Sequence, residues 1–272
     1  MNNYITSQGN VTLVADENEI HIRTLHSSPI IYKNAKKFVD DIPVLFKNAK
    51  GILLDVFIHS PIGFKTNIDF CEAIRKKFDV LHIRYSFLSP KSSTTSYIIF
   101  FANVKLEFGE TVFVVVVSGA ELWISEYEFT LNGYKVLSDK RIDINVKEED
   151  SKLIRDKILG ESNPKKIILV CAEGSNAKFF RTVLKSKKLV AFDRMPEVTE
   201  NAVDEIAKWL FDESVVKHHI IPMCERNYFF ITVIGEKTFP ITFLEPSERL
   251  PVNKTFTVSE CNEKIVVSSF LL

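Results

Sequence analysis

Residues 166–173 read Lys166-Ile167-Ile168-Leu169-Val170-Cys171-Ala172-Glu173. A short run of β-branched and apolar residues like this predicts a strand that is buried within a sheet. An amphipathic helix is predicted to follow over residues 176–186, because one helical face carries Phe179, Phe180, Val183 and Leu184. A buried strand followed by an amphipathic helix is typical of α/β folds.

The same alternation of strands and helices extends outward from this segment through most of the chain. Two hairpins are predicted, one over 11–24 around the turn Asp16-Glu17-Asn18 and one over 122–143, where Asn132-Gly133 is a strong turn signal. The two halves of this region share a strand–hairpin–helix order, as an internally duplicated fold would. Further strands are predicted at 52–58, 80–85 and 111–117, and helices at 33–47, 68–78, 147–159 and 200–213.

The pattern changes after about Val215. Residues 218–272 hold short runs of β-formers separated by prolines, without helical periodicity. This predicts a separate all-β module, with a boundary near Val216-Lys217. Its most hydrophobic run, Tyr228-Phe229-Phe230-Ile231, has two interpretations: a strand that packs in a core, or a surface that contacts a protein partner.

The composition argues against several classes of function. Lys plus Arg and Asp plus Glu both number 35, and a neutral chain lacks the positive charge that nucleic acids or anionic membranes attract. The four cysteines form no CxxC pair, so a zinc knuckle is not predicted. Adjacent His218 and His219 would point to opposite faces of a strand, which favours a linker over a metal site. No basic segment followed by an apolar core marks a signal peptide, and we expect a cytoplasmic protein.

The order of the predicted elements resembles the 70-kDa heat-shock chaperone family. Residues Ile5-Thr6-Ser7-Gln8-Gly9-Asn10 are similar to that family's first phosphate hairpin, and Ser89-Pro90 to its helix start E-P-T-A-A-A. Residues 113–125 are similar to the second phosphate hairpin, D-L-G-G-G-T-F-D-V-S, and residues 166–173 to the adenosine segment, V-L-V-G-G-S. Thr199-Glu200-Asn201-Ala202-Val203 stands where the family has P-D-E-A-V.

This resemblance implies an α/β protein with an actin-like ATPase core. The core would consist of two related lobes, residues 1–110 and 111–216. Each lobe has too few residues between its hairpin and its next strand to hold the family's peripheral subdomains. A small all-β module, residues 217–272, would follow as a shortened form of the chaperone substrate-binding domain. Residues Ile220-Ile221-Pro222 resemble the start of that domain.

The positions that handle ATP in the family are degenerate in this chain. Phosphoryl transfer in this fold needs glycines for close backbone approach to the phosphates and carboxylates for the metal ion. In the second phosphate hairpin the family's Asp corresponds to Val116, its three glycines to Ser118, Gly119 and Ala120, and its Thr to Glu121. In the first hairpin the expected Asp falls near Thr6, with Gly9 as the only glycine. Ser89 replaces the family's Glu, and Cys171 and Ala172 replace the glycine pair of the adenosine segment. We therefore expect a pseudo-ATPase without a bound cofactor or metal.

The leading hypothesis is a non-catalytic chaperone-like scaffold or co-chaperone subunit that binds a protein partner or a nascent chain. By resemblance to the family's ribosome-associated members, that partner would be a J-domain co-chaperone or a ribosome-associated factor. Two alternatives stay open: an ATP-binding chaperone with unconventional nucleotide contacts, and an actin-like structural protein that assembles with itself. Neither nucleic acid nor a membrane is expected as a direct partner.

Overall fold

The computed structural model describes residues 9, 11–16, 18–23, 30–144, 150–224, 227–234, 236–245, 248–250, 252, 254, 255 and 264–270. The chain divides into two compact units, Met1–Ile220 and Ile221–Leu272. Residues 217–220, which the sequence pattern places with the β-module, belong to the first unit. The reason is backbone pairing, because Tyr134 N donates to the His219 carbonyl (2.8 Å) and Tyr134 bridges to Ile220.

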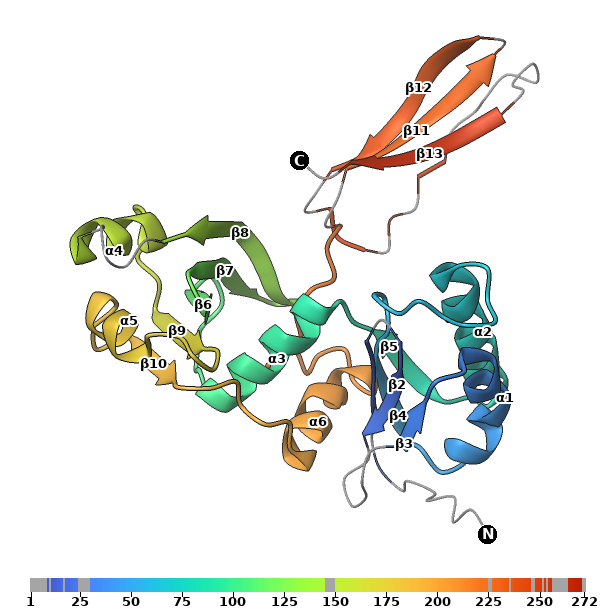
Figure 1. The fold of residues 1–272 in the computed structure, drawn as a ribbon, viewed down its shortest axis with the longest axis horizontal. Coiled ribbons are helices and arrows are strands. Elements are labelled where there is room, and N and C mark those ends of the chain that lie inside the picture. Colours follow the sequence, from blue (N-terminus) through green and yellow to red (C-terminus); the bar gives the residue numbers. More distant parts are fainter. Residues whose placement is uncertain are drawn as a thin grey trace. The chain divides into compact units, whose positions relative to one another are not determined.

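The first unit contains the same succession of elements twice, three strands followed by alternating helices and strands (Figure 1). The first lobe comprises β1 (Val11–Ala15), β2 (Ile20–Arg23), β3 (Ile30–Tyr32), α1 (Ala35–Leu45), β4 (Gly51–Asp55), α2 (Asn67–Val80), β5 (Arg84–Phe87) and α3 (Pro90–Ala102). The second comprises β6 (Thr111–Ser118), β7 (Glu121–Thr130), β8 (Gly133–Asp143), α4 (Ser151–Leu159), β9 (Lys166–Cys171), α5 (Ala177–Val183), β10 (Leu189–Phe192) and α6 (Glu200–Ala207), followed by the 3-10 helix η1 (Lys208–Leu210).

The two sheets have the same topology. The strand order is β3-β2-β1-β4-β5 in the first lobe and β8-β7-β6-β9-β10 in the second. In each, the first three strands pair antiparallel, and the first strand also pairs parallel with the fourth. The prediction of two related lobes is therefore confirmed. Between the third and fourth strands each lobe has a single helix, α1 or α4. These are the positions at which the family's peripheral subdomains would be inserted.

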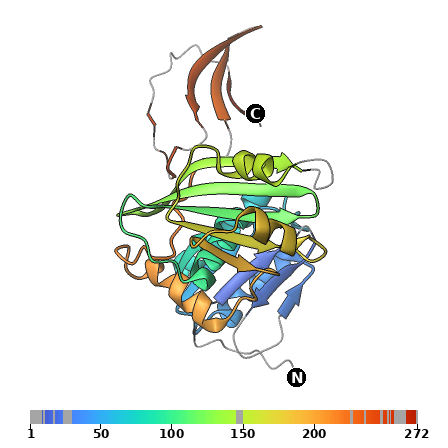
Figure 2. The same ribbon diagram turned by 90° about the vertical axis from the view of Figure 1, so that its left-hand side faces the viewer.

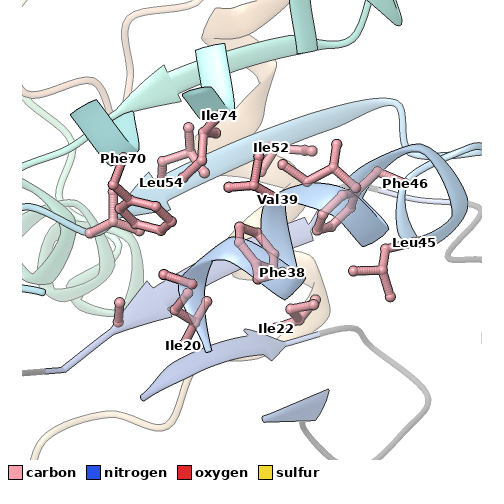
Figure 3. Close-up of a cluster of buried hydrophobic side chains, with 14 of the residues drawn as sticks. Ile20, Ile22, Phe38, Val39, Leu45, Phe46, Ile52, Leu54, Phe70 and Ile74 are labelled. Atoms are coloured by element: carbon pink, nitrogen blue, oxygen red, sulfur yellow. The ribbon is translucent and has the colours of Figure 1, made fainter. Parts of the chain in front are cut away.

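Each sheet has one face covered by its own pair of helices. In the first lobe, α1 and α2 pack Phe38 and Phe70 against Ile52 and Leu54 of β4, together with Phe46 at the end of α1 (Figure 3). The spacing of these residues on the helices is the amphipathic pattern expected from the sequence. In the second lobe, α4 and α5 cover the equivalent face, and Figure 2 shows these olive and gold helices lying against the green strands.

The opposite faces are covered by helices exchanged between the lobes. Helix α3 leaves the first lobe and packs Ile98 and Ile99 against the second sheet. Helix α6 leaves the second lobe and packs Val203 and Ile206 with Leu53 of the first sheet. This exchange, visible between the sheets in Figure 1, joins the two lobes into one folded unit.

Several predicted boundaries differ from the structure for local reasons. Strands β3 and β10 are only three and four residues long, too short to show a period in the sequence. Val80, predicted to begin a strand, ends α2, and the strand begins at Arg84. The helix predicted at 147–159 begins at Ser151, because Asp150 accepts a hydrogen bond from Lys152 N and caps it; residues 147–149 lie outside the described part.

The second unit is a three-stranded antiparallel sheet, as the all-β prediction requires. Its order is β12 (Lys237–Leu244), β11 (Asn227–Ile234) and β13 (Lys264–Phe270), with a bulge between β11 and β12 at Phe230/Ile231. Across the parts of the chain that the structure describes, none of the helices combines the length and apolarity needed to cross a bilayer.

Candidate functional site

The hairpin turn between β6 and β7 stands where the resemblance places the second phosphate loop. Ser118, Gly119 and Ala120 are exposed there, and Gly119 has a φ of +64°. Its N–H donates to Ser175 Oγ (3.2 Å), and this hydroxyl donates to the Val117 carbonyl (3.2 Å). The turn is therefore tied to the loop after β9, and the backbone donor that a phosphate would need is already engaged.

The positions on either side of this turn take part in packing and in a surface network. Val116 packs, partly buried, against the apolar cluster that α3 forms on the second sheet. The Glu121 carboxylate forms an ion pair with Arg141 and accepts a hydrogen bond from Trp123 Nε1 (2.9 Å). The Arg141 guanidinium also lies over the Trp123 ring, 5.8 Å from its centroid. Glu121 is thus held by its neighbours on β7 and β8.

Ser89 and the adenosine segment have structural roles as well. The Ser89 hydroxyl accepts a hydrogen bond from Ser92 N (3.1 Å) and caps α3, with Pro90 in the first turn. Cys171 is buried in the cluster beneath α4 and α5, and burial raises the pKa of its thiol. Ala172 N donates to the Val117 carbonyl (2.8 Å) and fixes the start of the loop after β9.

The turn of the first hairpin lies at a different place from the one that the resemblance assigns. Thr6 lies outside the described residues, and Gly9 precedes β1. The turn that joins β1 to β2 is closed by Asp16, whose Oδ1 accepts the N–H groups of Asn18 and Glu19 (both 2.8 Å). These bonds hold the pKa of Asp16 below its ordinary value. The pattern of β-formers predicts the turn at this place, after Ala15, and that prediction is confirmed. An Asx turn of this kind closes a hairpin without glycine, so it lacks the glycines of the phosphate loop that the resemblance places at residues 5–10.

The same turn gathers three groups that could hold a metal ion. The ligand atoms of Asp16, Glu19 and His21 lie within 4.8 Å of one another. His21 Nε2 lies 3.2 Å from Asp16 Oδ2, and Lys33 Nζ lies 3.3 Å from Glu19 Oε1. Two carboxylates and an imidazole are a donor set that Zn²⁺ or Mn²⁺ accepts. Here the turn and the contacts with His21 and Lys33 already account for the cluster.

Among the described acids of the first lobe, Asp55, the last residue of β4, has the most perturbed pKa. Alternation along the strand puts it on the face of Leu53, where α3 and α6 pack. Asp55 is 8% exposed, and its Oδ1 has no hydrogen-bond partner within the described part of the chain. Burial raises the pKa of this carboxyl to about 6, although a hydrogen bond from Ser93 opposes the rise.

The location of Asp55 favours a role in binding or proton transfer. In open α/β sheets, ligands bind outside the carboxyl ends of parallel strands, which is where Asp55 lies. A carboxyl with a pKa of about 6 exchanges its proton close to neutral pH. His59 is also buried, donates from Nδ1 to the Asp16 carbonyl (2.8 Å) and leaves Nε2 without a partner among the described residues. This end of the sheet thus carries two buried polar groups with unsatisfied atoms.

Neither Asp55 nor His59 was singled out from the sequence. The signal for Asp55 is an acid that ends an otherwise apolar strand, Ile52-Leu53-Leu54-Asp55. His59 follows the strand in a loop, and its burial depends on the packing of its ring against Phe70, 5.4 Å away between centroids.

In the second unit, strand alternation divides the four predicted contact residues between the two faces of the sheet. Phe229 and Ile231 lie on one face of β11, and Tyr228 and Phe230 lie on the other. The four residues therefore belong to two surfaces. Phe229 stacks on Phe243 across the strand pair (6.3 Å between centroids), and the two residues are 38% and 49% exposed.

Comparison with known proteins finds similarity in three dimensions but none in sequence. No protein-family model matches this chain, and no curated protein matches it. The solved structures that it is similar to include YeaZ from Pseudomonas aeruginosa (9% identity, 74% of this chain and 91% of that chain, TM-score 0.35). They also include a Bacteroides thetaiotaomicron protein with an actin-like ATPase fold and unknown function (9% identity, 75% and 98%, TM-score 0.36). A third is a ROK family protein from Streptococcus pneumoniae in complex with sucrose (9% identity, 77% and 97%, TM-score 0.38).

The fold is that of an actin-like ATPase. The assignment rests on the duplicated strand order of the two lobes and on the exchange of α3 and α6 between them. The chemistry of this chain has to be argued from its own residues.

Proposed function

We propose that this chain is a non-catalytic actin-like scaffold, a degenerate relative of the 70-kDa heat-shock chaperones, that binds a protein partner through the sheet of residues 221–272. The partner is proposed to be a J-domain co-chaperone or a ribosome-associated factor. The observation that carries the non-catalytic part is the β6–β7 turn. Its single glycine already donates to Ser175, and its acidic residue, Glu121, is already paired with Arg141.

The binding part of the proposal is supported by the aromatic side chains of the second unit. Phe239 and Phe243 of β12 are 44% and 49% exposed, and they lie on strand positions that face opposite sides of the sheet. Half-exposed aromatic rings on a small sheet are typical of surfaces that receive extended peptides or partner strands.

The nucleotide part is tested by thermal unfolding with and without millimolar Mg-ATP. A ligand at a hundredfold excess over its dissociation constant stabilises the native state by about 2.7 kcal/mol, which shifts the melting temperature measurably. We expect no shift and no ATP hydrolysis. A clear shift would support the second candidate function, ATP binding through unconventional contacts. Asp55 is the observation that favours this candidate, because an ionised carboxylate can hold Mg²⁺; Asp55→Asn should then abolish the shift.

The partner-binding part is tested by a matched pair of substitutions in the full chain. Phe243→Ser removes an exposed ring that stacks on Phe229, and Phe108→Ser removes one that is 61% exposed and stacks on Phe129 of the first unit. Affinity purification from the native cells, with quantitative mass spectrometry, should show a protein that Phe243→Ser loses and Phe108→Ser retains. Equal recovery with both variants would remove the sheet from consideration as the binding surface. Co-sedimentation with ribosomes tests the ribosome-associated form of the proposal.

A further inference from the structure

The sheet of the second unit has two outer strands, β12 and β13, because β11 pairs with both of them (Figure 1). Among the described residues, no further strand pairs with the outer edge of either. An edge strand presents unpaired N–H and C=O groups, and proteins protect such edges with prolines, bulges and lysines, because an unprotected edge pairs with other chains. The two outer strands of this sheet differ in these protections.

Strand β12 carries all three protections. Pro240 stands in its middle, and the bulge at Phe230/Ile231 interrupts its pairing with β11. Lys254 Nζ donates a hydrogen bond to the Phe243 carbonyl (3.0 Å). A carbonyl that accepts from a lysine outside the sheet points away from β11, and a proline in an edge strand turns its nitrogen to the same side. The outer edge of β12 is therefore interrupted and partly occupied.

Strand β13 carries none of these protections. After Lys264 at its start it reads Ile265-Val266-Val267-Ser268-Ser269-Phe270, without proline, glycine or charge. Its register with β11 runs from Asn227↔Phe270 to Val233↔Lys264 without a bulge. Uncharged segments of six or seven residues with high β-propensity are those that pair with further strands when an edge is exposed. The outer edge of β13 is thus a template for another strand.

The register shows which residues of β13 have their N–H and C=O groups on this outer edge. In an antiparallel sheet these groups point alternately toward the two neighbouring strands. Phe243 points its carbonyl away from β11, so its partner Phe229 points its groups toward β13, where Ser268 is opposite. Ser268 therefore bonds to β11. By alternation, the outer edge presents the N–H and C=O groups of Ile265, Val267 and Ser269.

This edge is complementary to the same edge of a second copy. Two antiparallel β13 strands related by a two-fold axis at Val267 place residues 265, 267 and 269 of one copy opposite 269, 267 and 265 of the other. The outward N–H and C=O groups of both strands then meet in register, as an antiparallel ladder requires. Lys264 lies opposite Phe270, so no like charges are brought together.

Self-pairing also removes both unprotected edges at once. With primes for the second copy, the strand order becomes β12-β11-β13-β13′-β11′-β12′, and the outer strands are the protected β12 and β12′. The contact uses the same surface on both copies, so it is closed and leaves no edge of β13 for a third. The segment that covers each β13 edge is thus supplied by the chain itself.

We propose that this chain forms a two-fold dimer through antiparallel pairing of β13 with the β13 strand of a second copy. The contact uses backbone groups of β13, whereas the proposed partner-binding surface uses aromatic side chains of β11 and β12. The dimer goes beyond the proposed function, and each can be present without the other.

Proline substitution in the full chain tests the contact. Val267→Pro removes the central N–H of the outer edge and no hydrogen bond to β11. Thr238→Pro is the matched control, because Thr238 lies opposite Val233 and by the same alternation points its N–H away from β11 on the other outer strand. Sedimentation equilibrium over a range of micromolar concentrations should show the same dimer for the natural chain and Thr238→Pro. Val267→Pro should raise the dissociation constant by about tenfold or more, since both hydrogen bonds of the central pair are lost.

Disulfide crosslinking tests the register without proline. In the proposed pairing, position 266 of one copy lies directly opposite position 268 of the other, with Cβ atoms about 4.5–5.5 Å apart. A mixture of Val266→Cys chains and Ser268→Cys chains should therefore form covalent dimers under a mild oxidant. Each variant alone should form no more than the natural chain, because 266 and 266, or 268 and 268, would be diagonal neighbours about 7–8 Å apart.

Several outcomes would overturn the proposal. They are a natural chain that stays monomeric at every concentration, a dimer that Val267→Pro leaves unchanged or that Thr238→Pro weakens equally, and a mixture that crosslinks no better than the single variants. If circular dichroism shows that Val267→Pro unfolds the second unit, the crosslink of the mixture decides alone. Equal loss of the dimer and of a bound partner in Val267→Pro, but not in Phe243→Ser, would place both contacts on β13 and refute their independence.

Discussion

Replacing Asp55 by asparagine should stabilise the protein at neutral pH and have almost no effect in acid. Asparagine has the same size and can keep the hydrogen bond with Ser93, but it carries no charge into the apolar layer beneath α3 and α6. Burial raises the pKa of the Asp55 carboxyl from 3.8 to about 6. The folded state therefore binds this proton more tightly than the unfolded state does, and ionisation costs folding stability as pH rises through this window.

The expected size follows from the pKa shift. One pKa unit corresponds to about 1.4 kcal/mol, so the ionised carboxylate costs the folded state about 3 kcal/mol above pH 6 and almost nothing below pH 4. The difference in unfolding free energy between Asp55→Asn and the natural chain should follow this curve. At neutral pH it corresponds to a melting temperature higher by roughly 5–10 °C for a unit of this size.

Urea unfolding between pH 4 and pH 8 measures this difference. Intrinsic tryptophan fluorescence reports on the first unit alone, because both tryptophans, Trp123 and Trp209, lie in it. Asp156→Asn, at an exposed position of α4, is the control and should change stability by less than about 0.5 kcal/mol. If Asp55→Asn left the unfolding free energy at pH 7.5 unchanged or lowered it, the inference that Asp55 is a buried carboxylate without a compensating charge would be refuted.

A buried histidine and a hairpin glycine of the first unit give two further predictions, and Gly109→Ala is the control for the second. His218 is 4% exposed, both of its ring nitrogens are unsatisfied among the described residues, and burial lowers its pKa to about 4. The natural chain should therefore lose about 3 kcal/mol of unfolding free energy as pH falls from 6.5 to 4. His218→Phe should remove this loss, which urea unfolding measures. Gly133→Ala should destabilise by more than about 2 kcal/mol, because φ is +115° and the new Cβ would lie 2.5 Å from the His219 carbonyl oxygen. Gly109→Ala, at φ +86° with open space around the new Cβ, should lower the unfolding free energy by only about 1 kcal/mol. Equal losses of stability at both positions would mean that the backbone moves to relieve the clash between the Cβ at position 133 and the His219 carbonyl.

The fold was largely predictable because its signals are local. The alternation of apolar strands with amphipathic helices identifies the two α/β lobes, and Asn132-Gly133 marks the β7–β8 turn correctly. The short strands β3 and β10 were not predicted, because their few residues form strands only through pairing with β2 and β9. The exchange of α3 and α6 between the lobes is a tertiary feature that no local pattern encodes.

The site was less predictable, because burial and partners decide its chemistry. Gly119 and Glu121 are correctly placed in a hairpin, but their engagement by Ser175 and Arg141 depends on residues far along the chain. The β-formers on either side of Asp16 locate the first hairpin turn in the sequence, but the side-chain hydrogen bonds by which Asp16 closes it are seen only in the structure. Asp55 looks like an ordinary strand-end acid until the packing of α3 and α6 removes it from water.

The two perturbed groups of the first unit also make a joint prediction, because their pH dependences oppose each other. Asp55 costs stability as pH rises from about 4 to 6, and His218 costs stability as pH falls from 6.5 to about 4. At pH 5 each penalty is about half developed, roughly 1.5–2 kcal/mol, so their sum stays near 3 kcal/mol from pH 4 to pH 7. The natural chain should therefore show a nearly flat stability profile in this range, as far as these groups determine it.

Only the single variants reveal the two slopes. Asp55→Asn should expose the acid-side loss caused by His218, and His218→Phe should expose the loss toward neutral pH caused by Asp55. The two side chains contact α3 near Ser93 and Phe100, seven residues apart, or about 10 Å along a helix, so their effects should be additive. The double variant should then be flat again and about 3 kcal/mol more stable than the natural chain throughout. A double variant that keeps a slope, or whose gain departs from additivity by more than about 1 kcal/mol, would show that the two groups are coupled through α3.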